Sequence, residues 1–291
     1  VDKYLLGQEL EVDAICDGED VLIPGIMEHV ERAGIHSGDS ISLYPPQNVP
    51  DEQLDRIVEL TRALSRKLHV KGLVNIQYIL FNDEVYVIEV NPRSSRTVPF
   101  ISKATGLPVV DLGVKASLGM KLADLGYGTG LYEGPGIVAV KLPVFSSEKL
   151  PGVEVSLGPE MKSTGEVIGL GSNVTEAMVK GFVAAGMMNK RGGVLISVNK
   201  KDRELVLPVA RVLANEGCTL YATPGTAKYL GIQGLVVTAV PKISQSHDAL
   251  LKLLMDGHIN IIIDTPTRGR EPERYGFRMR RAAVERGVTC L

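Results

Sequence analysis

The sequence predicts a chain of mixed class, α/β and α+β, in which an antiparallel sheet with helices precedes a doubly wound parallel sheet. Two observations predict this class. In the first part, strand-like apolar runs are joined by short turns, as in the hairpin of 73–81 and 85–90. From Gly193 onward, short apolar runs alternate with helical segments, which indicates parallel strand–helix repeats. We therefore predict one domain at 1–189 and a second at 190–291.

Composition argues against several classes of partner. The 291 residues carry 32 Lys and Arg against 34 Asp and Glu, a net charge of −2, so neither nucleic acid nor an anionic membrane is expected to bind. Aromatic residues make up only 5%, which disfavours stacking on bases. The three cysteines lie far apart, which favours reduced thiols and a cytoplasmic location. No apolar run approaches the roughly 18 residues of a membrane helix.

The first domain is expected to open with strands at 12–16 and 21–23, and the polar stretch 25–40 is expected to be a functional loop. Pro50 then opens a helix that packs on the hairpin. The apolar positions of this helix are Leu54, Ile57, Val58, Leu64 and Leu68. Further along, we expect a helix at 109–120, irregular structure around one strand (136–144) at 126–165, and a helix at 175–187.

The second domain is expected to bind an anion at one edge of its sheet. Its predicted strands are 194–198, 219–223, 235–240 and 259–264, and its predicted helices 209–215, 226–230, 246–255 and 278–286. In open parallel sheets, ligands bind beyond the carboxyl ends of the strands. Those ends carry Thr, Gly and basic residues at 199–203, 223–226 and 264–268, which suits a phosphate-sized group. Helix capping by Asp202, Thr226 or Ser246 explains each loop alone, whereas three converging loops favour a ligand.

The register of the hairpin decides which side chains share a face. A three-residue loop pairs Phe81 with Val85 and sets Gln77 directly opposite Glu89. A two-residue loop would pair Gln77 with Ile88 and send Glu89 to the far face. We predict the first register, because it brings the polar side chains together.

In that register, Gln77, Glu89 and Asn91 converge on one patch. A carboxylate flanked by two amide oxygens suits a hard, partly hydrated cation that bridges phosphates, namely Mg²⁺. Arg93 and Arg96, just past the strand, are placed to hold anionic oxygens. The alternative is an ordinary strand end with a surface salt bridge.

Several stretches of this sequence match motifs of one known family. These stretches are Ala14-Ile15-Cys16-Asp17-Gly18, Met27-Glu28-His29, His36-Ser37-Gly38-Asp39-Ser40, Val87-Ile88-Glu89-Val90-Asn91-Pro92-Arg93, Arg96-Thr97-Val98-Pro99-Phe100 and Leu157-Gly158-Pro159-Glu160-Met161. They resemble the large chain of the carbamoyl-phosphate synthase family. The strand–helix repeats are similar to that family's regulatory domain, which has a methylglyoxal-synthase-like (MGS-like) fold. The resemblance implies the C-terminal lobe of an ATP-grasp domain, from the half that phosphorylates carbamate.

The resemblance also implies roles for the residues of the hairpin. Gln77 and Glu89 are expected to bind one Mg²⁺ or Mn²⁺ on the phosphates of ATP, and Glu89 with Asn91 a second ion. Arg93 and Arg96 are expected to orient carbamate or carbamoyl phosphate.

Other implied contacts lie outside the hairpin. Glu9 resembles the residue that contacts the ribose of ATP, and the loop that holds His29, His36 and Ser37 is similar to a potassium site of the ATP-binding region. The family implies a glutamine amidotransferase small subunit as partner, and a place in pyrimidine and arginine biosynthesis. Both ends of the chain are interpreted as cut, the second domain as C-terminally truncated and the upstream lobe as missing, so this piece alone is expected to be inactive.

Two effector sites follow from the resemblance. Glu31 and Asp39 match acids that line the ornithine site of relatives, but Leu142 stands where a third acid is needed, which argues against an amino-acid activator. A nucleotide of the UMP or IMP type is implied for the second domain. The matching residues are Arg203, Thr223, Thr226 and Thr265. Lys242 is displaced, and an anionic Asp264 near a phosphate is unfavourable, so we expect a different effector or weak regulation.

Three alternatives stay open at this point. Another ATP-grasp ligase, such as a biotin-carboxylase-like enzyme, is opposed by the second domain and by the loop at 36–40. A working methylglyoxal synthase is opposed by 265–270, which offers no catalytic aspartate. A non-catalytic nucleotide-binding module is the third alternative.

Overall fold

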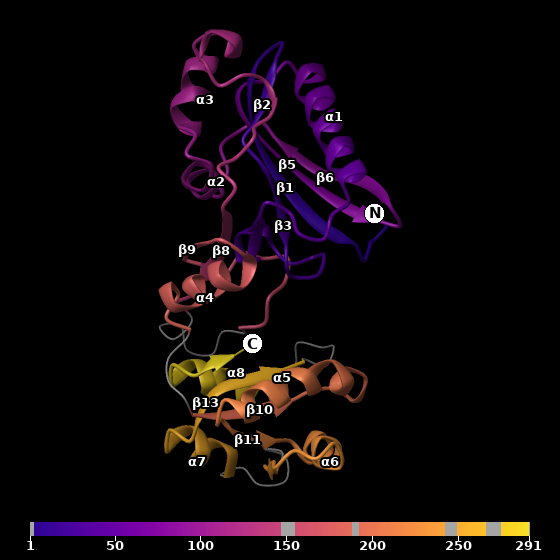
Figure 1. Ribbon diagram of the computed structural model, residues 1–291, viewed down its shortest axis with the longest axis vertical. Helices are drawn as coiled ribbons and strands as arrows, with labels where there is room; N and C mark the ends of the chain where they lie inside the picture. Colours follow the sequence, from indigo (N-terminus) through magenta and orange to yellow (C-terminus); the bar gives the residue numbers. More distant parts are fainter. Residues whose placement is uncertain (1–2, 147–154, 188–191, 242–248, 266–274, 291) are drawn as a thin grey trace. The chain divides into compact units, whose positions relative to one another are not determined.

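The chain divides into two compact units. The computed structural model describes residues 3–146, 155–187, 192–241, 249–265 and 275–290. Unit 1 comprises Val1–Phe145 and Leu157–Gly186, and unit 2 comprises Ser146–Ser156 and Met187–Leu291. Unit 1 contains a mainly antiparallel sheet with helices and unit 2 a parallel sheet with helices (Figure 1), which confirms the predicted fold class. The division into functional domains at 189/190 stays a prediction.

The sheet of unit 1 has the strand order β6-β5-β1-β3-β4-β8-β9, with β2 paired to β1 and β7 to β2. Its strands are β1 (Gln8–Asp17), β2 (Val21–Ile23), β3 (Ile26–His29), β4 (Ser42–Tyr44), β5 (Lys71–Phe81), β6 (Glu84–Asn91), β7 (Gly130–Leu131), β8 (Val138–Val144) and β9 (Gly165–Gly171). Its helices are α1 (Asp51–Lys67), α2 (Val98–Thr105), α3 (Val109–Ser117) and α4 (Val174–Ala184), with 3-10 turns η1 (Ser37–Asp39) and η2 (Leu122–Asp124).

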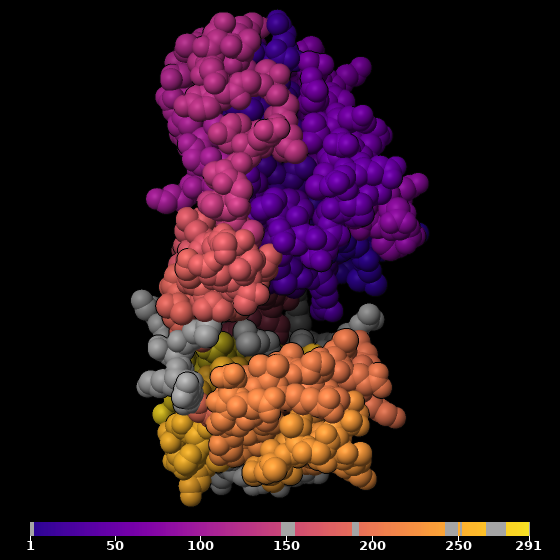
Figure 2. Space-filling view, in the orientation of Figure 1, coloured from indigo at the N-terminus to yellow at the C-terminus, as the bar shows by residue number. Residues whose placement is uncertain are grey.

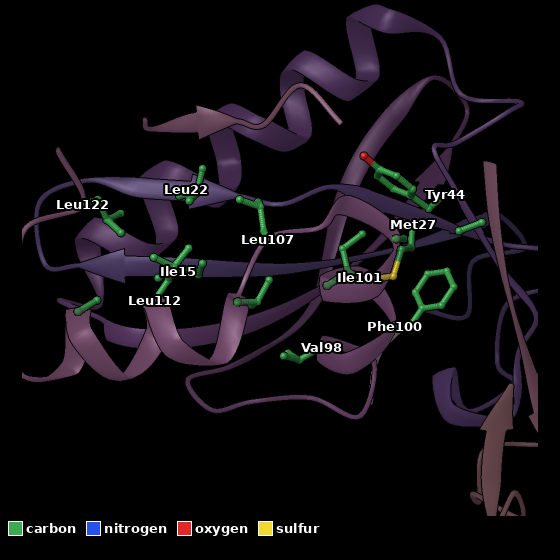
Figure 3. Close-up of a cluster of buried hydrophobic side chains, with 14 residues drawn as sticks. Ile15, Leu22, Met27, Tyr44, Val98, Phe100, Ile101, Leu107, Leu112 and Leu122 are labelled. Carbon is green, nitrogen blue, oxygen red and sulfur yellow. The ribbon is translucent and has the colours of Figure 1, made fainter. Parts of the chain in front are cut away.

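Alternation along β1 separates the two faces of this sheet. Leu10, Val12 and Ala14 are fully buried in a core that includes Ile57 of α1. On the other face, Ile15 joins a second core built from α2 and α3 (Figure 3). The residues that precede Ile15 on its face are Glu9, Glu11 and Asp13. This second face is therefore apolar at one end and polar at the other.

Helix α1 begins directly after Pro50, as predicted. Acidic residues in its first turn and basic residues in its last turn both favour the helix dipole. The predicted positions Leu54, Ile57, Val58 and Leu64 pack into the core with the strands. The prediction for Leu68 is wrong, because this residue follows the last helical residue and is 54% exposed.

Three other predictions for unit 1 need correction. The stretch 25–40 is not a loop throughout, because 26–29 form β3 and pair with β1 and β4. Helix α2 and strand β9 were not predicted. The second residue of α2 is a proline, which argues against a helix, and the three glycines of β9 resemble those of a turn. Helix α3 ends at Ser117 rather than Met120, and Gly119 beyond it has a φ of 95°.

The described strands of unit 2 form a parallel sheet with the order β12-β11-β10-β13-β14. The strands are β10 (Gly193–Ser197), β11 (Thr219–Ala222), β12 (Thr238–Ala239), β13 (Ile259–Asp264) and β14 (Thr289–Cys290). The helices are α5 (Arg203–Asn215), α6 (Pro224–Ile232), α7 (Ala249–Met255) and α8 (Tyr275–Glu285). Figure 2 shows the side of this unit covered by α5 and α6. The predicted alternation of strands and helices is confirmed; Lys242, Ser246 and 266–268 lie outside the described residues.

None of the helices in the described ranges combines the length and the apolar composition that crossing a membrane requires.

Candidate functional site

The hairpin of β5 and β6 sets Gln77 directly opposite Glu89, the pairing that was predicted. The predicted three-residue loop is wrong, because Phe81 pairs with Glu84 and the turn contains only Asn82 and Asp83. Both turn residues have positive φ, 51° and 61°, as a type I′ turn requires.

A β-bulge at Ile88 corrects the register of this hairpin. Tyr78 pairs with Val87, but the next residue back, Gln77, pairs with Glu89, so Ile88 is an extra residue in β6. Beyond the bulge, Asn75 pairs with Asn91. The turn and the bulge together therefore place Gln77, Glu89 and Asn91 on one face.

Two hydrogen bonds orient the side chains of this patch. Asn91 Nδ2 donates to Glu89 Oε1 at 2.9 Å, and Gln77 Nε2 donates to Ser37 Oγ at 3.2 Å. Both amides use their nitrogen in these bonds, which leaves their oxygens for a ligand. No cluster of three or more His, Cys, Asp or Glu able to hold a metal occurs among the described residues, so a cation here would depend on amide oxygens as well as Glu89. This oxygen set fits the chemistry of Mg²⁺.

Two carboxylates lie buried beside this patch. Glu11 pairs with Gln77 across β1 and β5, and Asp13 pairs with Asn75. Glu11 is 2% exposed and Asp13 is 1% exposed. Asn75 Nδ2 donates to both, at 2.8 Å to Glu11 Oε1 and 3.1 Å to Asp13 Oδ1. Burial and the neighbouring charge of Glu11 raise the pKa of Asp13, so Asp13 holds a proton more readily than an ordinary aspartate.

His29 lies between two acids at the next strand of the sheet. Its Nδ1 is 3.6 Å from Glu9 Oε2, and its Nε2 is 3.5 Å from Glu11 Oε2. Burial alone would lower the pKa of His29, but Glu11 and Glu9 together raise it. Burial would raise the pKa of Glu11, yet His29, Lys141 and Asn75 lower it. The surroundings therefore favour the imidazolium form of His29 and the carboxylate form of Glu11.

The predicted arginines follow β6. Arg93 is exposed, and its Nη1 donates to Ser94 O at 3.0 Å. Arg96 Nη1 donates to Ser163 Oγ at 3.3 Å, and Arg96 Nε lies 3.6 Å from Glu166 Oε1 of β9. Arg96 is thus held by the far edge of the sheet, while Arg93 extends into solvent.

The loop at 36–40 is held by hydrogen bonds within the loop and to residues of unit 1. His36 Nδ1 accepts from Gly38 N at 3.0 Å, and the buried Lys141 donates from Nζ to Ser37 O at 2.9 Å. Asp39 accepts from two backbone N–H groups, Lys162 and Ser163, each at 2.8 Å. This loop therefore brings Ser37 next to Gln77.

The two acids of the predicted amino-acid effector site have partners within unit 1. Asp39 is fully buried, and Glu31 Oε2 accepts from Ile41 N at 2.7 Å. Burial raises the pKa of Glu31. Leu142, at the position of the third acid, is fully buried in an apolar cluster with Ala177.

The residues predicted to bind an anion in unit 2 follow the carboxyl ends of β10, β11 and β13. A Cβ atom at Gly225 would lie 2.5 Å from Arg203 Nη2, so the arginine rests against the start of α6. Thr223 and Thr226 are buried, and their hydroxyls lie 3.4 Å apart. Thr265 Oγ1 accepts from Asn199 N at 2.8 Å. Among the described residues, Arg203, Thr223, Thr226 and Thr265 thus lie at or just beyond the carboxyl ends of neighbouring strands, while Lys242 and 266–268 lie outside the described ranges.

Asp264 does not stand as a free anion at this edge. Arg280 Nη1 donates to Asp264 Oδ2 at 2.9 Å, and both side chains are largely buried. Burial raises the pKa of Asp264. The ion pair offsets the negative charge that was expected to oppose a phosphate.

Several site residues were missed by sequence reasoning. They are Glu11, Asp13, Asn75, Ser95 and Lys141. The alternation Glu9-x-Glu11-x-Asp13 within one strand is a signal that three acids share a face. The burial of Glu11 and Asp13 has no such signal, because their partners Thr97 and Ser95 lie 86 and 82 positions downstream.

Comparison with known proteins agrees with these features. Residues 1–125 match the family described as the ATP-binding domain of the carbamoyl-phosphate synthase L chain, and residues 205–291 match the MGS-like domain. The chain is 53% identical to the carbamoyl phosphate synthase large chain of Lachnoclostridium phytofermentans and 51% identical to that of Clostridium beijerinckii. Each alignment covers 100% of this chain and 27% of the relative.

Among solved structures, the biotin carboxylase domain of a single-chain bacterial carboxylase aligns with a TM-score of 0.48 and 16% identity, over 64% of this chain and 47% of that one. A likeness this distant carries no argument about function. Along its whole length the chain is therefore similar to part of the carbamoyl phosphate synthase large chain, with a match to that family's ATP-binding domain followed by a match to an MGS-like domain.

Proposed function

We propose that unit 1 carries part of an active site that phosphorylates carbamate with ATP to give carbamoyl phosphate. The observation that supports this most directly is the pairing of Gln77 with Glu89, with Asn91 on the same face. The relatives bear the name of the enzyme that makes this product. The alternative function, that of another ATP-grasp ligase, is supported neither by the names of these relatives nor by the match to an MGS-like domain.

In this proposal, the patch holds the metal ions on the phosphates of ATP. Gln77 and Glu89 would bind one Mg²⁺ or Mn²⁺, and Glu89 with Asn91 a second. When bound, such ions would offset the negative charge of the phosphates, which otherwise repels the attacking anionic oxygen. Glu9 would contact the ribose, and the loop of His29, His36 and Ser37 would hold K⁺. The assignment of Gln77 and Asn91 as metal ligands is supported by the bonds that their amide nitrogens make, because these bonds leave the amide oxygens to face a ligand.

The two arginines would bind the second substrate. Arg93 and Arg96 carry permanent charge and planar donors, which suit the oxygens of carbamate and carbamoyl phosphate. Holding the attacking oxygen in line with the transferred phosphoryl group supplies much of the rate enhancement in such reactions. Because carbamate decomposes in water, the complete site must also exclude solvent.

The chain spans about 27% of the length of the curated relatives, so the activity of the whole protein is itself part of the proposal. We propose that the intact large chain acts with a glutamine amidotransferase small subunit, in the cytoplasm, for pyrimidine and arginine biosynthesis. The piece alone is proposed to be inactive.

The test is synthesis of ATP from ADP and carbamoyl phosphate by the full-length large chain. Glu89→Gln removes the only carboxylate of the patch and is expected to lower the rate by about 100-fold or more. Glu84→Gln, at the exposed start of the same strand, is the matched control and should leave the rate unchanged. Equal rates for Glu89→Gln and the unmodified protein would contradict the proposed function and favour a non-catalytic nucleotide-binding module.

A second function is proposed for unit 2, the binding of a nucleotide effector of UMP or IMP type. The supporting observation is Arg203, whose buried Nε has no hydrogen-bond partner among the described residues and whose guanidinium lies against Gly225. A guanidinium at a helix N-terminus favours a phosphate group.

Calorimetric titration of residues 190–291 with UMP and with IMP tests this proposal. Arg203→Ala should abolish binding, and Arg211→Ala, at an exposed position further along the same helix, should not. The earlier expectation of a weak site rests on Asp264, and micromolar affinity for UMP would refute it. No heat with either nucleotide would refute the site itself.

A further inference from the structure

The two buried carboxylates, Glu11 and Asp13, need hydrogen-bond donors, because burying an unpaired acid is strongly unfavourable. Asn75 satisfies only one oxygen of each. Two further donors come from the segment 93–97, which we call the arginine segment because it contains Arg93 and Arg96. The second oxygen of Glu11, Oε2, makes no hydrogen bond among the described residues and faces His29 Nε2 at 3.5 Å.

Two hydroxyls of the arginine segment meet these acids. Ser95 Oγ donates to Asp13 Oδ2 at 2.7 Å, and Thr97 Oγ1 donates to Glu11 Oε1 at 3.0 Å. Ser95 Oγ also accepts from Thr97 N at 3.0 Å. The Ser95 hydroxyl therefore links the backbone of its own segment to strand β1.

These bonds fix the backbone from which both arginines extend. Ser95 lies two residues after Arg93 and directly before Arg96. Arg93 donates to Ser94 O, inside the same segment, so the place of its guanidinium follows the backbone conformation. Thr97 is buried and directly precedes α2, and its carbonyl oxygen accepts from Ile101 N at 3.0 Å, which ties the segment to the first turn of the helix.

We propose that Ser95, Asp13 and Glu11 are positioning residues, which hold the arginine segment so that Arg93 and Arg96 meet the carbamoyl group in one geometry. This inference rests on the proposed function of the same site. The three residues do not touch substrate; they act through the backbone between the arginines.

Removal of one hydroxyl separates this role from a general role in stability. Ser95→Ala leaves Asp13 Oδ2 and Thr97 N without their partner, so the segment loses its attachment to β1. A displacement of about 1 Å at such a site lowers a rate by up to about 100-fold. We therefore expect kcat per folded molecule to fall by about 10- to 100-fold and KM for carbamoyl phosphate to rise, with KM for ADP unchanged. A purely structural role would reduce the yield of folded protein and leave all three constants unchanged.

The experiment measures ATP formation from ADP and carbamoyl phosphate by the full-length large chain. Ser95→Thr keeps the hydroxyl and should restore most of the rate. Ser94→Ala is the matched control, because the exposed Ser94 hydroxyl bonds only to Ser95 O, at 3.3 Å, in the described structure. If Ser95→Ala had the same kcat and KM values as Ser94→Ala, the inference would be overturned.

Reference variants distinguish this failure from failure of the proposed function. If Glu89→Gln and Arg96→Ala lose activity and Ser95→Ala does not, the inference alone is wrong. If Glu89→Gln and Arg96→Ala both keep full activity, the proposed function is wrong and the positioning role falls with it.

A measurement independent of activity tests the attachment itself. In Ser95→Ala, hydrogen exchange at the amide of Thr97 should become faster, since this N–H loses its acceptor. The same amide should be unchanged in Ser94→Ala. Unchanged exchange in Ser95→Ala would contradict the attachment even if the rate had fallen.

Discussion

Glu11 and Asp13 show how neighbouring acids acquire different properties from their surroundings. Both lie on one face of β1 and both are buried. The pKa of Glu11 is lowered, against the effect of burial, by His29 and Lys141. The pKa of Asp13 is raised by burial and by the charge of Glu11. One acid is thus held as an anion, and the other tends to keep its proton.

This difference predicts a pH dependence of stability. An ordinary aspartate has a pKa of 3.8, and that of Asp13 in the fold is about 8. Between these values the folded state binds more protons than the unfolded state. The contribution of Asp13 to the free energy of unfolding therefore falls as pH rises, by at most about 1.4 kcal/mol per pH unit. Asp13→Asn should remove this slope, as measured by urea unfolding between pH 5 and pH 8.

The exposed Asp55→Asn is the control, and it should unfold with the slope of the unmodified protein. An unchanged slope in Asp13→Asn would show that Asp13 is ionised throughout this range.

At the residue scale, the sequence predicted which polar side chains of the hairpin share a face better than it predicted the residues that support them. Glu89, Asn91 and Gln77 follow from alternation on two neighbouring strands. The roles of Asp13 and Ser95 depend on a contact across 82 positions, which no local pattern contains. Lys141 is a buried cation, which composition and periodicity alone would place at the surface.

At the scale of elements, the predicted pairing of Gln77 with Glu89 in the hairpin is confirmed, whereas the predicted length of its turn is wrong. The predicted loop had three residues, and the observed turn has two. The extra residue lies at Ile88 instead, so Gln77 still meets Glu89. A bulge is hard to predict from sequence because it depends on contacts with both neighbouring elements rather than on one residue type.

Strand β9 was missed because its glycines resemble turn residues, although here they permit close packing. A Cβ atom at Gly169 would lie 1.9 Å from Ala177 O and 2.6 Å from Gly181 N of α4. These are backbone atoms, which cannot move away without displacing the helix. Helix α4 therefore rests directly on the strand.

Gly169→Ala is expected to lower the free energy of unfolding of unit 1 by about 1–3 kcal/mol, because the new methyl group separates α4 from β9. Thermal unfolding followed by circular dichroism measures this. Gly165→Ala, in the same strand, places its methyl 3.7 Å from Val144 Cβ, an ordinary contact, and should have little effect. Equal midpoints for the two variants would contradict direct contact between helix and strand.

At the scale of the whole molecule, each unit has its own buried core. Unit 1 contains the clusters around Ile15, Leu10 and Val140, and unit 2 those around Leu195 and Val194. The change from hairpins to strand–helix repeats near Gly193 predicted this organisation.

The extra residue at Ile88 has a consequence for the evolution of this hairpin. If the turn at Asn82 and Asp83 had one more residue and β6 lacked the extra residue at Ile88, Gln77 would still lie opposite Glu89. An insertion at the tip and a deletion at the bulge would thus compensate each other, and the pairing of Gln77 with Glu89 would be kept.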